Sequence, residues 1–248
     1  MPRARASRPG AGTRSSPLPG ADEPGRPVRL VVGLGNPEPR YARTRHNAGQ
    51  MVVEQVAERL GAGRWRPRFA GRVAEARGPA GPLTLLVPTT YMNLSGQSVG
   101  PAAGMLRAAP EQVLVVHDDL DLPFGIVRGK AGGGTGGPNG LASIRDGLGG
   151  GGFLRVRLGI GRPGPDWRGD EADWVLAAFS EPPEQVGEML TRAIAMVEAV
   201  LADGMEAAIA RFHASEPGAK ARERRARREA ARAAAEGAEA PPPEGAAG

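Results

Sequence analysis

The sequence predicts an α/β protein with one central sheet that is largely parallel or mixed. Short apolar runs of strand length alternate along the chain with segments whose apolar residues have helical spacing, and this alternation is typical of the class. The 248 residues are enough to bury a real core, in one large domain or two small ones. The chain contains no internal repeat.

The expected strands are short apolar runs, and the first of them, 28–34, ends in Gly-Asn-Pro, which marks the start of a loop. In the last run, 153–160, Arg155 and Arg157 alternate onto one face. Between these two lie the other candidate strands, at 83–87, 113–116 and 125–128.

The expected helices have apolar residues at helical spacing. Residues 51–60 stop at Gly61, a suitable C-cap. Residues 184–201 form the longest amphipathic segment. Further helices are expected at 98–106, 141–148 and 205–213.

Both ends of the chain differ in composition from the part between them. Residues 1–27 are rich in Pro, Gly, Ala, Ser and Arg and have no hydrophobic periodicity, so we expect a disordered tail. Residues 214–248 form a charged Ala/Arg/Glu and Pro-rich segment without an apolar face, and we expect this tail to be disordered too. The folded domain is therefore predicted to span 28–213.

Composition excludes several classes of protein. The absence of cysteine excludes disulfide scaffolds, thiolate nucleophiles and Cys-ligated zinc or iron–sulfur sites. No apolar run approaches the ~20 residues that span a bilayer, so no membrane protein is expected. No apolar segment follows the basic N-terminus, which argues against a secretion signal. We therefore expect a cytoplasmic protein.

The whole chain has a net charge of +5, and charge is unevenly distributed along the predicted domain. Residues 28–160 hold 16 basic and 9 acidic side chains, whereas residues 161–213 hold 4 basic and 10 acidic ones. A polarised body of this kind, basic in its N-terminal portion, can engage a polyanion.

Polar residues collect at three predicted strand ends, where open α/β sheets place their ligands: 33–47, 88–96 and 117–140. A dinucleotide-binding loop at 33–38 is disfavoured, because the third glycine is missing and a proline stands where the helix would begin. The absence of G-x-S-x-G disfavours a nucleophile-elbow hydrolase. Asp118, Asp119 and Asp121 could bind Mg²⁺, but a solvated strand end is an equal interpretation.

His46 is the strongest single candidate for catalysis. It lies between Arg45 and Asn47, just before an amphipathic helix and beside a basic stretch. Histidine titrates near neutrality, so a histidine oriented by a carboxylate can act as a general base on water. A capping or loop histidine is the alternative interpretation.

Four motifs carry a resemblance to a known family. GLGNPEPRYARTRHNAG begins at Gly33, VPTTYMNLSG at Val87, HDDLDLPFGIVRGKAGGGTGGPNGLASI at His117 and RVRLGIGRPG at Arg155. In this order they resemble the bacterial-type peptidyl-tRNA hydrolase family, and the similarity extends from Val28 to about His213.

The resemblance implies a monomeric single-domain α/β fold with a mixed twisted β-sheet flanked by helices. It implies hydrolysis of the ester bond between peptide and tRNA in peptidyl-tRNA, which recycles tRNA from products that drop off the ribosome. It implies no cofactor and no metal. The partner would be peptidyl-tRNA, held through its acceptor stem and 3′ end in the cytoplasm.

The resemblance also implies roles for individual residues. His46 would activate water, Asp118 would hydrogen-bond His46 and hold its basic form, and Asn93 would place an amide near the oxyanion or the water. Asn36 would distinguish a blocked peptidyl nitrogen from a free amine. The remaining matches divide between the substrate groove, lined by Tyr41, Tyr91 and Asn139, and a clamp on the tRNA 5′ phosphate, formed by Lys130 and Arg157 with Arg155.

Three residues depart from the family pattern. Glu38 replaces a glycine, and it would strain the loop that carries Asn36 if that position required a positive φ. Thr135 and Pro138 replace two histidines of the glycine-rich loop. The alternative to an active enzyme is therefore a catalytically weak or silent relative that binds tRNA.

Overall fold

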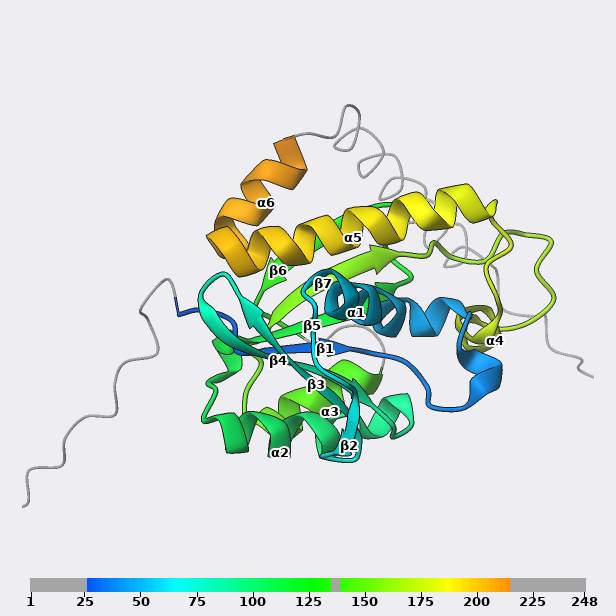
Figure 1. Cartoon of the computed structure of the whole chain (residues 1–248). Coiled ribbons are helices and arrows are strands. Elements are labelled where there is room, and N and C mark those ends of the chain that lie inside the picture. The colour runs from blue at the N-terminus through cyan, green and yellow to red at the C-terminus, as the bar shows by residue number, and fades with distance from the viewer. Residues whose placement is uncertain (1–25, 135–138, 215–248) are drawn as a thin grey trace, which may run out of the picture.

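A computed structural model describes residues 26–134 and 139–214 and contains one mixed sheet of seven strands in the order β2-β3-β4-β1-β5-β7-β6 (Figure 1). Neighbouring strands are parallel at the centre, where β1 pairs with β4 and β5, and β5 pairs with β7. They are antiparallel at both edges. The strands are β1 (Leu30–Gly33), β2 (Arg66–Arg68), β3 (Gly71–Gly78), β4 (Gly81–Pro88), β5 (Val113–Asp119), β6 (Val127–Ala131) and β7 (Leu154–Gly159). The predicted α/β class with a mixed sheet flanked by helices is confirmed.

Helices cover both faces of this sheet (Figure 1). One face packs against α1 (Ala48–Arg59), α5 (Pro183–Asp203) and α6 (Met205–Ala214). The other packs against α2 (Gly96–Leu106) and α3 (Asn139–Leu148). Shorter elements lie between them: α4 (Glu171–Leu176) and the 3₁₀ turns η1 (Pro39–Tyr41), η2 (Arg45–Asn47), η3 (Met92–Leu94) and η4 (Pro110–Gln112).

The alternation of strand residues divides the apolar core into two layers. Along β5, Leu114 and Val116 pack toward α1 and α5, whereas Val113 and Val115 pack toward α2 and α3. The same period sends the polar residues at the end of β5 to opposite faces. The two layers therefore determine which polar residues can meet at each face.

Two close approaches of backbone hold the helices against their neighbours. A Cβ on Gly49 would lie 2.1 Å from the Val116 carbonyl oxygen, so only glycine allows the start of α1 to contact β5. A Cβ on Gly96 would lie 1.9 Å from the Ser143 carbonyl oxygen, where α2 crosses α3. The first of these contacts brings the segment before α1 to the carboxyl end of β5.

All the predicted strands and helices are present, with shifted ends. The strand expected at 113–116 continues to Asp119, so the acidic cluster begins within β5 rather than after it. The sequence analysis did not predict β2, β3 or α4. All three residues of β2 are exposed, and β3 has few apolar residues, so strand pairing defines them rather than a hydrophobic pattern: β3 pairs with β4, and β2 pairs with β3.

The two predicted tails, 1–27 and 214–248, lie almost entirely outside the described residues. The disorder of these tails and the domain boundaries stay predictions. Pro27 does contact the domain, because its carbonyl accepts a hydrogen bond of 3.1 Å from the Gln112 side chain. Within the described part of the chain, no helix is both long and apolar enough to cross a membrane.

Candidate active site

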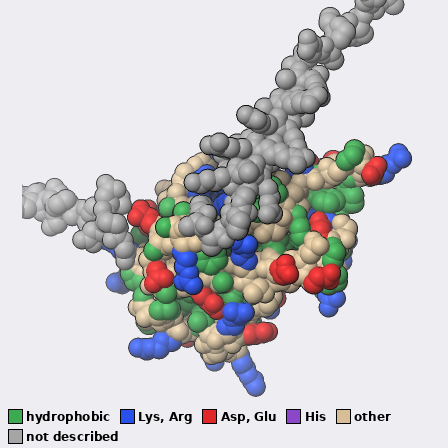
Figure 2. Space-filling model, turned by 90° about the horizontal axis from the view of Figure 1, so that it is seen from above, with side chains coloured by type: hydrophobic (Ala, Val, Ile, Leu, Met, Phe, Trp, Pro, Cys, Tyr) green, Lys and Arg blue, Asp and Glu red, His purple; other side chains and the backbone are tan. Residues whose placement is uncertain are grey.

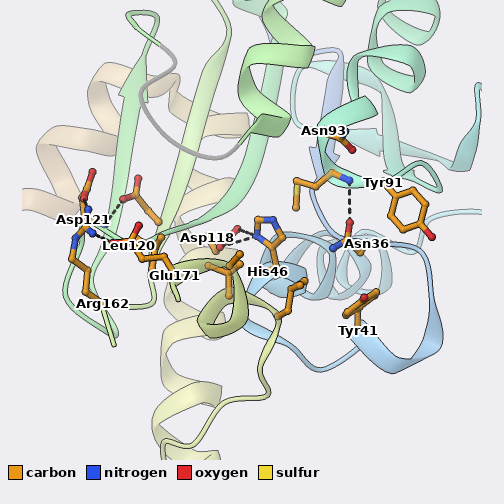
Figure 3. A pocket seen from close by; sticks show the side chains of 15 residues that line it. Asn36, Tyr41, His46, Tyr91, Asn93, Asp118, Leu120, Asp121, Arg162 and Glu171 are labelled. Carbon is orange, nitrogen blue, oxygen red and sulfur yellow. Dashed lines mark hydrogen bonds and ion pairs between the residues drawn. The ribbon is translucent and has the colours of Figure 1, made fainter. Parts of the chain in front are cut away.

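A cavity of about 690 Å³ opens at the carboxyl ends of β1, β4 and β5 (Figure 3). His46 and Asp118 lie in its centre. On one side the cavity is lined by Asn36, Tyr41, Tyr91, Met92 and Asn93. The opposite side is formed by Leu120, Asp121, Arg162 and four residues of α4. The cavity thus joins two of the polar clusters seen in the sequence with the beginning of the third.

The His46 imidazole is paired with the Asp118 carboxylate. Nδ1 of His46 lies 3.0 Å from each Asp118 oxygen, and both side chains are buried. When Nδ1–H donates to the carboxylate, the basic nitrogen is Nε2, which faces the cavity (Figure 3). Burial lowers the pKa of His46, but the charge and hydrogen bond of Asp118 outweigh it, so the pKa lies above its ordinary value.

Asn36 is oriented by two neighbours. The Asn47 side chain accepts a hydrogen bond from the Asn36 backbone N–H and donates one to the Asn36 carbonyl, both at 2.9 Å. Oδ1 of Asn36 accepts a bond of 3.0 Å from the Met92 backbone N–H. Because Oδ1 is occupied in this way, Nδ2 of Asn36 is the donor left for a ligand in the cavity.

Glu38 connects two sides of the cavity mouth. Its backbone has φ −74° and ψ 141°, an ordinary extended conformation, so the positive φ under which Glu38 would strain the loop is not present. The Tyr91 hydroxyl donates a hydrogen bond of 2.6 Å to Glu38, and Arg40 pairs with the same carboxylate at 2.6 Å. Glu38 therefore links the loop of Asn36 and Tyr41 to the residues before η3.

Asn93 lies in η3 and is exposed at the cavity. Among the described residues its amide has no hydrogen-bond partner, in contrast to the amides of Asn36 and Asn47. Both its donor and its acceptor remain available to a ligand.

The basic residues expected to bind phosphate lie on β6 and β7, on the sheet face opposite the His46–Asp118 pair. Lys130 is the cross-strand partner of Arg155, and Arg157 pairs with Asp119 at 2.7 Å. Burial, followed by the charges of Arg155 and Arg157, lowers the pKa of Lys130. No described carboxylate forms an ion pair with Lys130, and its ammonium remains available to an anion.

Arg155 is placed differently from its two neighbours. It is 2% exposed, and its guanidinium donates to the carbonyl oxygens of Gly132, Gly133 and Gly134. Its two terminal nitrogens hold this glycine-rich segment, and its buried Nε has no partner among the described residues. The expected role of Arg155 in the phosphate clamp does not fit these contacts.

Some candidate residues cannot be placed. Asn139 is the first residue of α3, but its side chain lies outside the described part of the structure, as do Thr135 and Pro138. The three aspartates considered for Mg²⁺ do not converge, because Asp118 contacts His46, Asp119 contacts Arg157 and Asp121 contacts Arg162. In the described ranges no group of three or more metal-ligating side chains is found.

Two residues that shape the site were missed in the sequence analysis. Asn47 holds the backbone of Asn36, and Arg45 is fully buried beside α4. Both flank His46 in η2. The available signal was three consecutive polar residues before a helix, which are unusual in a buried position.

Comparison with known proteins decides the family. The sequence pattern described as peptidyl-tRNA hydrolase matches residues 30–222, about three-quarters of the chain. This chain belongs to the peptidyl-tRNA hydrolase family. The peptidyl-tRNA hydrolase of Geotalea uraniireducens is 46% identical over 180 residues, which cover 72% of this chain and 92% of that protein. That of Symbiobacterium thermophilum is 46% identical over 189 residues, which cover 75% and 99%.

Solved structures of the family agree with the fold. A peptidyl-tRNA hydrolase crystallised with N-propanol superposes with a TM-score of 0.68 at 38% identity and covers 77% of this chain and 96% of its own. The enzyme from Acinetobacter baumannii gives a TM-score of 0.67 at 38% identity, with 75% and 94% covered. Nothing in these comparisons supports the alternative of a weak or silent relative.

Proposed function

We propose that this member of the peptidyl-tRNA hydrolase family cleaves the ester bond between peptide and tRNA, with His46 as the general base for water. The observation that carries the proposal is the His46–Asp118 pair, held at 3.0 Å beside a cavity that Asn36 and Asn93 also line. Its product is free tRNA, available for a new round of aminoacylation.

The proposed reaction begins when Nε2 of His46 takes a proton from water and the water oxygen attacks the ester carbonyl carbon. The Asn93 amide donates to the oxyanion of the tetrahedral intermediate. The carbon–oxygen bond to the terminal ribose then breaks, and the imidazolium returns its proton to the ribose oxygen. Asp118 keeps the ring in the correct tautomer and stabilises the imidazolium between these two steps.

Asn36 is proposed to select blocked substrates. Its free Nδ2 is a donor, so it suits the carbonyl of a first peptide bond and does not suit the ammonium of an aminoacyl-tRNA. Tyr41 and Tyr91 line the same side of the cavity and are proposed to contact the substrate there. Asn139 stays a predicted groove residue.

Lys130 and Arg157 are proposed to bind the tRNA 5′ phosphate, while Arg155 holds the glycine-rich segment beside them. Charge-assisted contacts of this kind position a nucleic acid without reading its sequence. We further propose that the enzyme works as a monomer in the cytoplasm. The groups named above are sufficient for the reaction, which as written calls for neither cofactor nor metal.

The direct test is incubation of the purified protein with an N-blocked aminoacyl-tRNA, following release of the acyl group. We expect turnover by the parent and a loss of at least ~10²-fold in His46→Ala, in the range for a removed general base. Free aminoacyl-tRNA is the control substrate and should be cleaved poorly. Near-full turnover by His46→Ala would place the base elsewhere, and an inactive parent would refute the function.

A further inference from the structure

Arg45 is a fully buried cation whose side-chain contacts lie in α4 and in the segment that follows it. Its side chain is 1% exposed. Its guanidinium donates to the Ala178 carbonyl at 2.6 Å, to Ser180 Oγ at 2.9 Å and to Glu181 at 3.0 Å. Such a set of donors fixes the orientation of the guanidinium plane.

One face of that guanidinium covers the Trp174 ring. The central carbon of Arg45 lies 3.6 Å from the centroid of Trp174, which is part of α4, and 5.5 Å from that of Phe179. The backbone repeats the connection, because the Arg45 N–H donates to the Ala177 carbonyl and Thr44 forms an antiparallel bridge with Ala178. Arg45 thus joins η2 to both ends of the 174–181 segment.

The opposite side of α4 faces the cavity. Glu171, Ala172, Val175 and Leu176 line it, so α4 supplies a wall of three apolar side chains and one carboxylate. Helix α4 has only six residues, and none of them is buried. A helix this short is unstable alone, and its position depends on the contacts that hold it.

We propose that Arg45 is a positioning residue that sets the distance between the α4 wall and the general base. Because Arg45 directly precedes His46, one short turn carries the base on one side and the anchor of the wall on the other. Substrate held against α4 is thereby placed in register with His46. This inference rests on the proposed function of the same cavity.

The chain offers a matched control for the chemistry of Arg45. Arg72, on β3, also pairs with a glutamate, Glu54, and lies 5.4 Å from the centroid of Trp65. It does not line the cavity. Arg72 is 39% exposed and makes fewer contacts, so replacing it with lysine controls for the loss of a glutamate pair and a ring contact outside the cavity.

The test compares Arg45→Lys, Trp174→Leu, their double variant and Arg72→Lys on N-blocked aminoacyl-tRNA. We expect KM to rise about tenfold in both single variants, since a small displacement of a positioning contact is costly. We expect the KM of the double variant to be no higher than that of the single variant with the higher KM, because the two residues act through one contact. We expect kcat of all three variants to stay within about twofold of the parent value. The pH midpoint of kcat should not move, because the His46–Asp118 pair is untouched. Arg72→Lys should retain the parent KM.

An unchanged KM in folded Arg45→Lys and Trp174→Leu would show that Arg45 has only a structural role in the core and would overturn the proposal. A shifted pH midpoint would also overturn it, because Arg45 would then act on the base. If Arg45→Lys does not fold, Trp174→Leu decides alone, since it changes a partly exposed side chain. Titration of the acyl-tRNA against the same variants in a His46→Ala background tests the role of Arg45 in substrate binding separately from the proposed hydrolysis. Weaker binding there supports the wall even if the parent proves inactive.

Discussion

At the scale of single residues, η2 carries three consecutive buried polar side chains that point to three different partners. Arg45 contacts the segment after α4, His46 contacts Asp118 and Asn47 holds the backbone of Asn36. Each makes hydrogen bonds that offset its burial, although Nε of Arg45 is buried without a partner among the described residues. The turn therefore couples the base, one wall of the cavity and the amide opposite that wall.

The His46–Asp118 pair predicts a pH dependence. A general base must be neutral, so kcat/KM should rise with pH through the raised pKa of His46. Asp118→Asn removes the charge that raises this pKa and leaves the burial that lowers it. We expect a lower plateau reached at a lower pH, measured as the pH profile of kcat/KM. A midpoint that stays in place or moves upward in Asp118→Asn would contradict the assignment.

At the scale of elements, β5 distributes its last residues between two sites. Its period of two sends Asp118 toward His46 on the α1 face and Asp119 toward Arg157 on the other face. One strand end thus supports the proposed chemistry and the proposed phosphate contact at once. A shift of β5 by one residue would exchange the two carboxylates and remove both pairs.

The crossing of α2 and α3 predicts opposite effects of the same substitution within one helix. Gly96→Ala places a methyl group against the backbone of α3 and should destabilise the protein by about 1–3 kcal/mol. Gly104→Ala, near the other end of α2, meets no atom within 4 Å and should stabilise the helix by up to about 1 kcal/mol. Thermal melting of both variants checks this. Equal melting temperatures would show that α2 and α3 separate without cost.

At the scale of the whole molecule, the distribution of charged side chains differs from one face to the other, which the net charge does not show. Figure 2 shows the side of the molecule with α5 and α6, where the visible acidic and basic side chains are interspersed. On the α2/α3 face of the sheet, by contrast, the edge strand β6 and its neighbour β7 carry Arg128, Lys130, Arg155 and Arg157. The basic excess of residues 28–160 therefore includes a local cluster suited to a polyanion.

This cluster predicts a salt-dependent contribution to tRNA binding. Lys130→Ala should weaken the binding of uncharged tRNAs of different sequence to a similar degree, and reduce the slope of log K against log salt by about one. Arg66→Ala, on the exposed strand β2 at the other edge of the sheet, is the control and should change neither quantity. Titrations at several salt concentrations measure both. A salt slope unchanged by Lys130→Ala would exclude Lys130 from the phosphate contact.

We expect removal of the two tails to change stability and activity little. Deleting residues 1–25 and 215–248 retains Pro27 and α6 and should leave the melting temperature and acyl release nearly unchanged, because neither segment has an apolar face to bury. The basic residues beyond 214 should add only a weak contact, lost with salt. Loss of most activity at moderate salt in the shortened protein would show that the tails take part.

The sequence by itself determined the α/β class, the order of the main elements and the principal candidates for chemistry. Periodicity is a local property, so the strands with buried apolar runs and the amphipathic helices could be predicted from it. The motif around His46 and the acidic cluster at the end of β5 also depend on neighbours in sequence. By contrast, β2 and β3 have weak patterns, and the pairing of β3 with β4 and of β2 with β3 depends on partners rather than on their own residues.

Only the tertiary structure decided which polar groups meet. Asp118 lies 72 residues from His46, Arg45 contacts residues more than 130 positions away, and Asn36 is oriented by Met92. The backbone angles of Glu38 and the carbonyl contacts of Arg155 likewise could not be derived from the motifs. Hydrogen bonds depend on distance and direction between atoms that folding brings together, and no local pattern encodes that geometry.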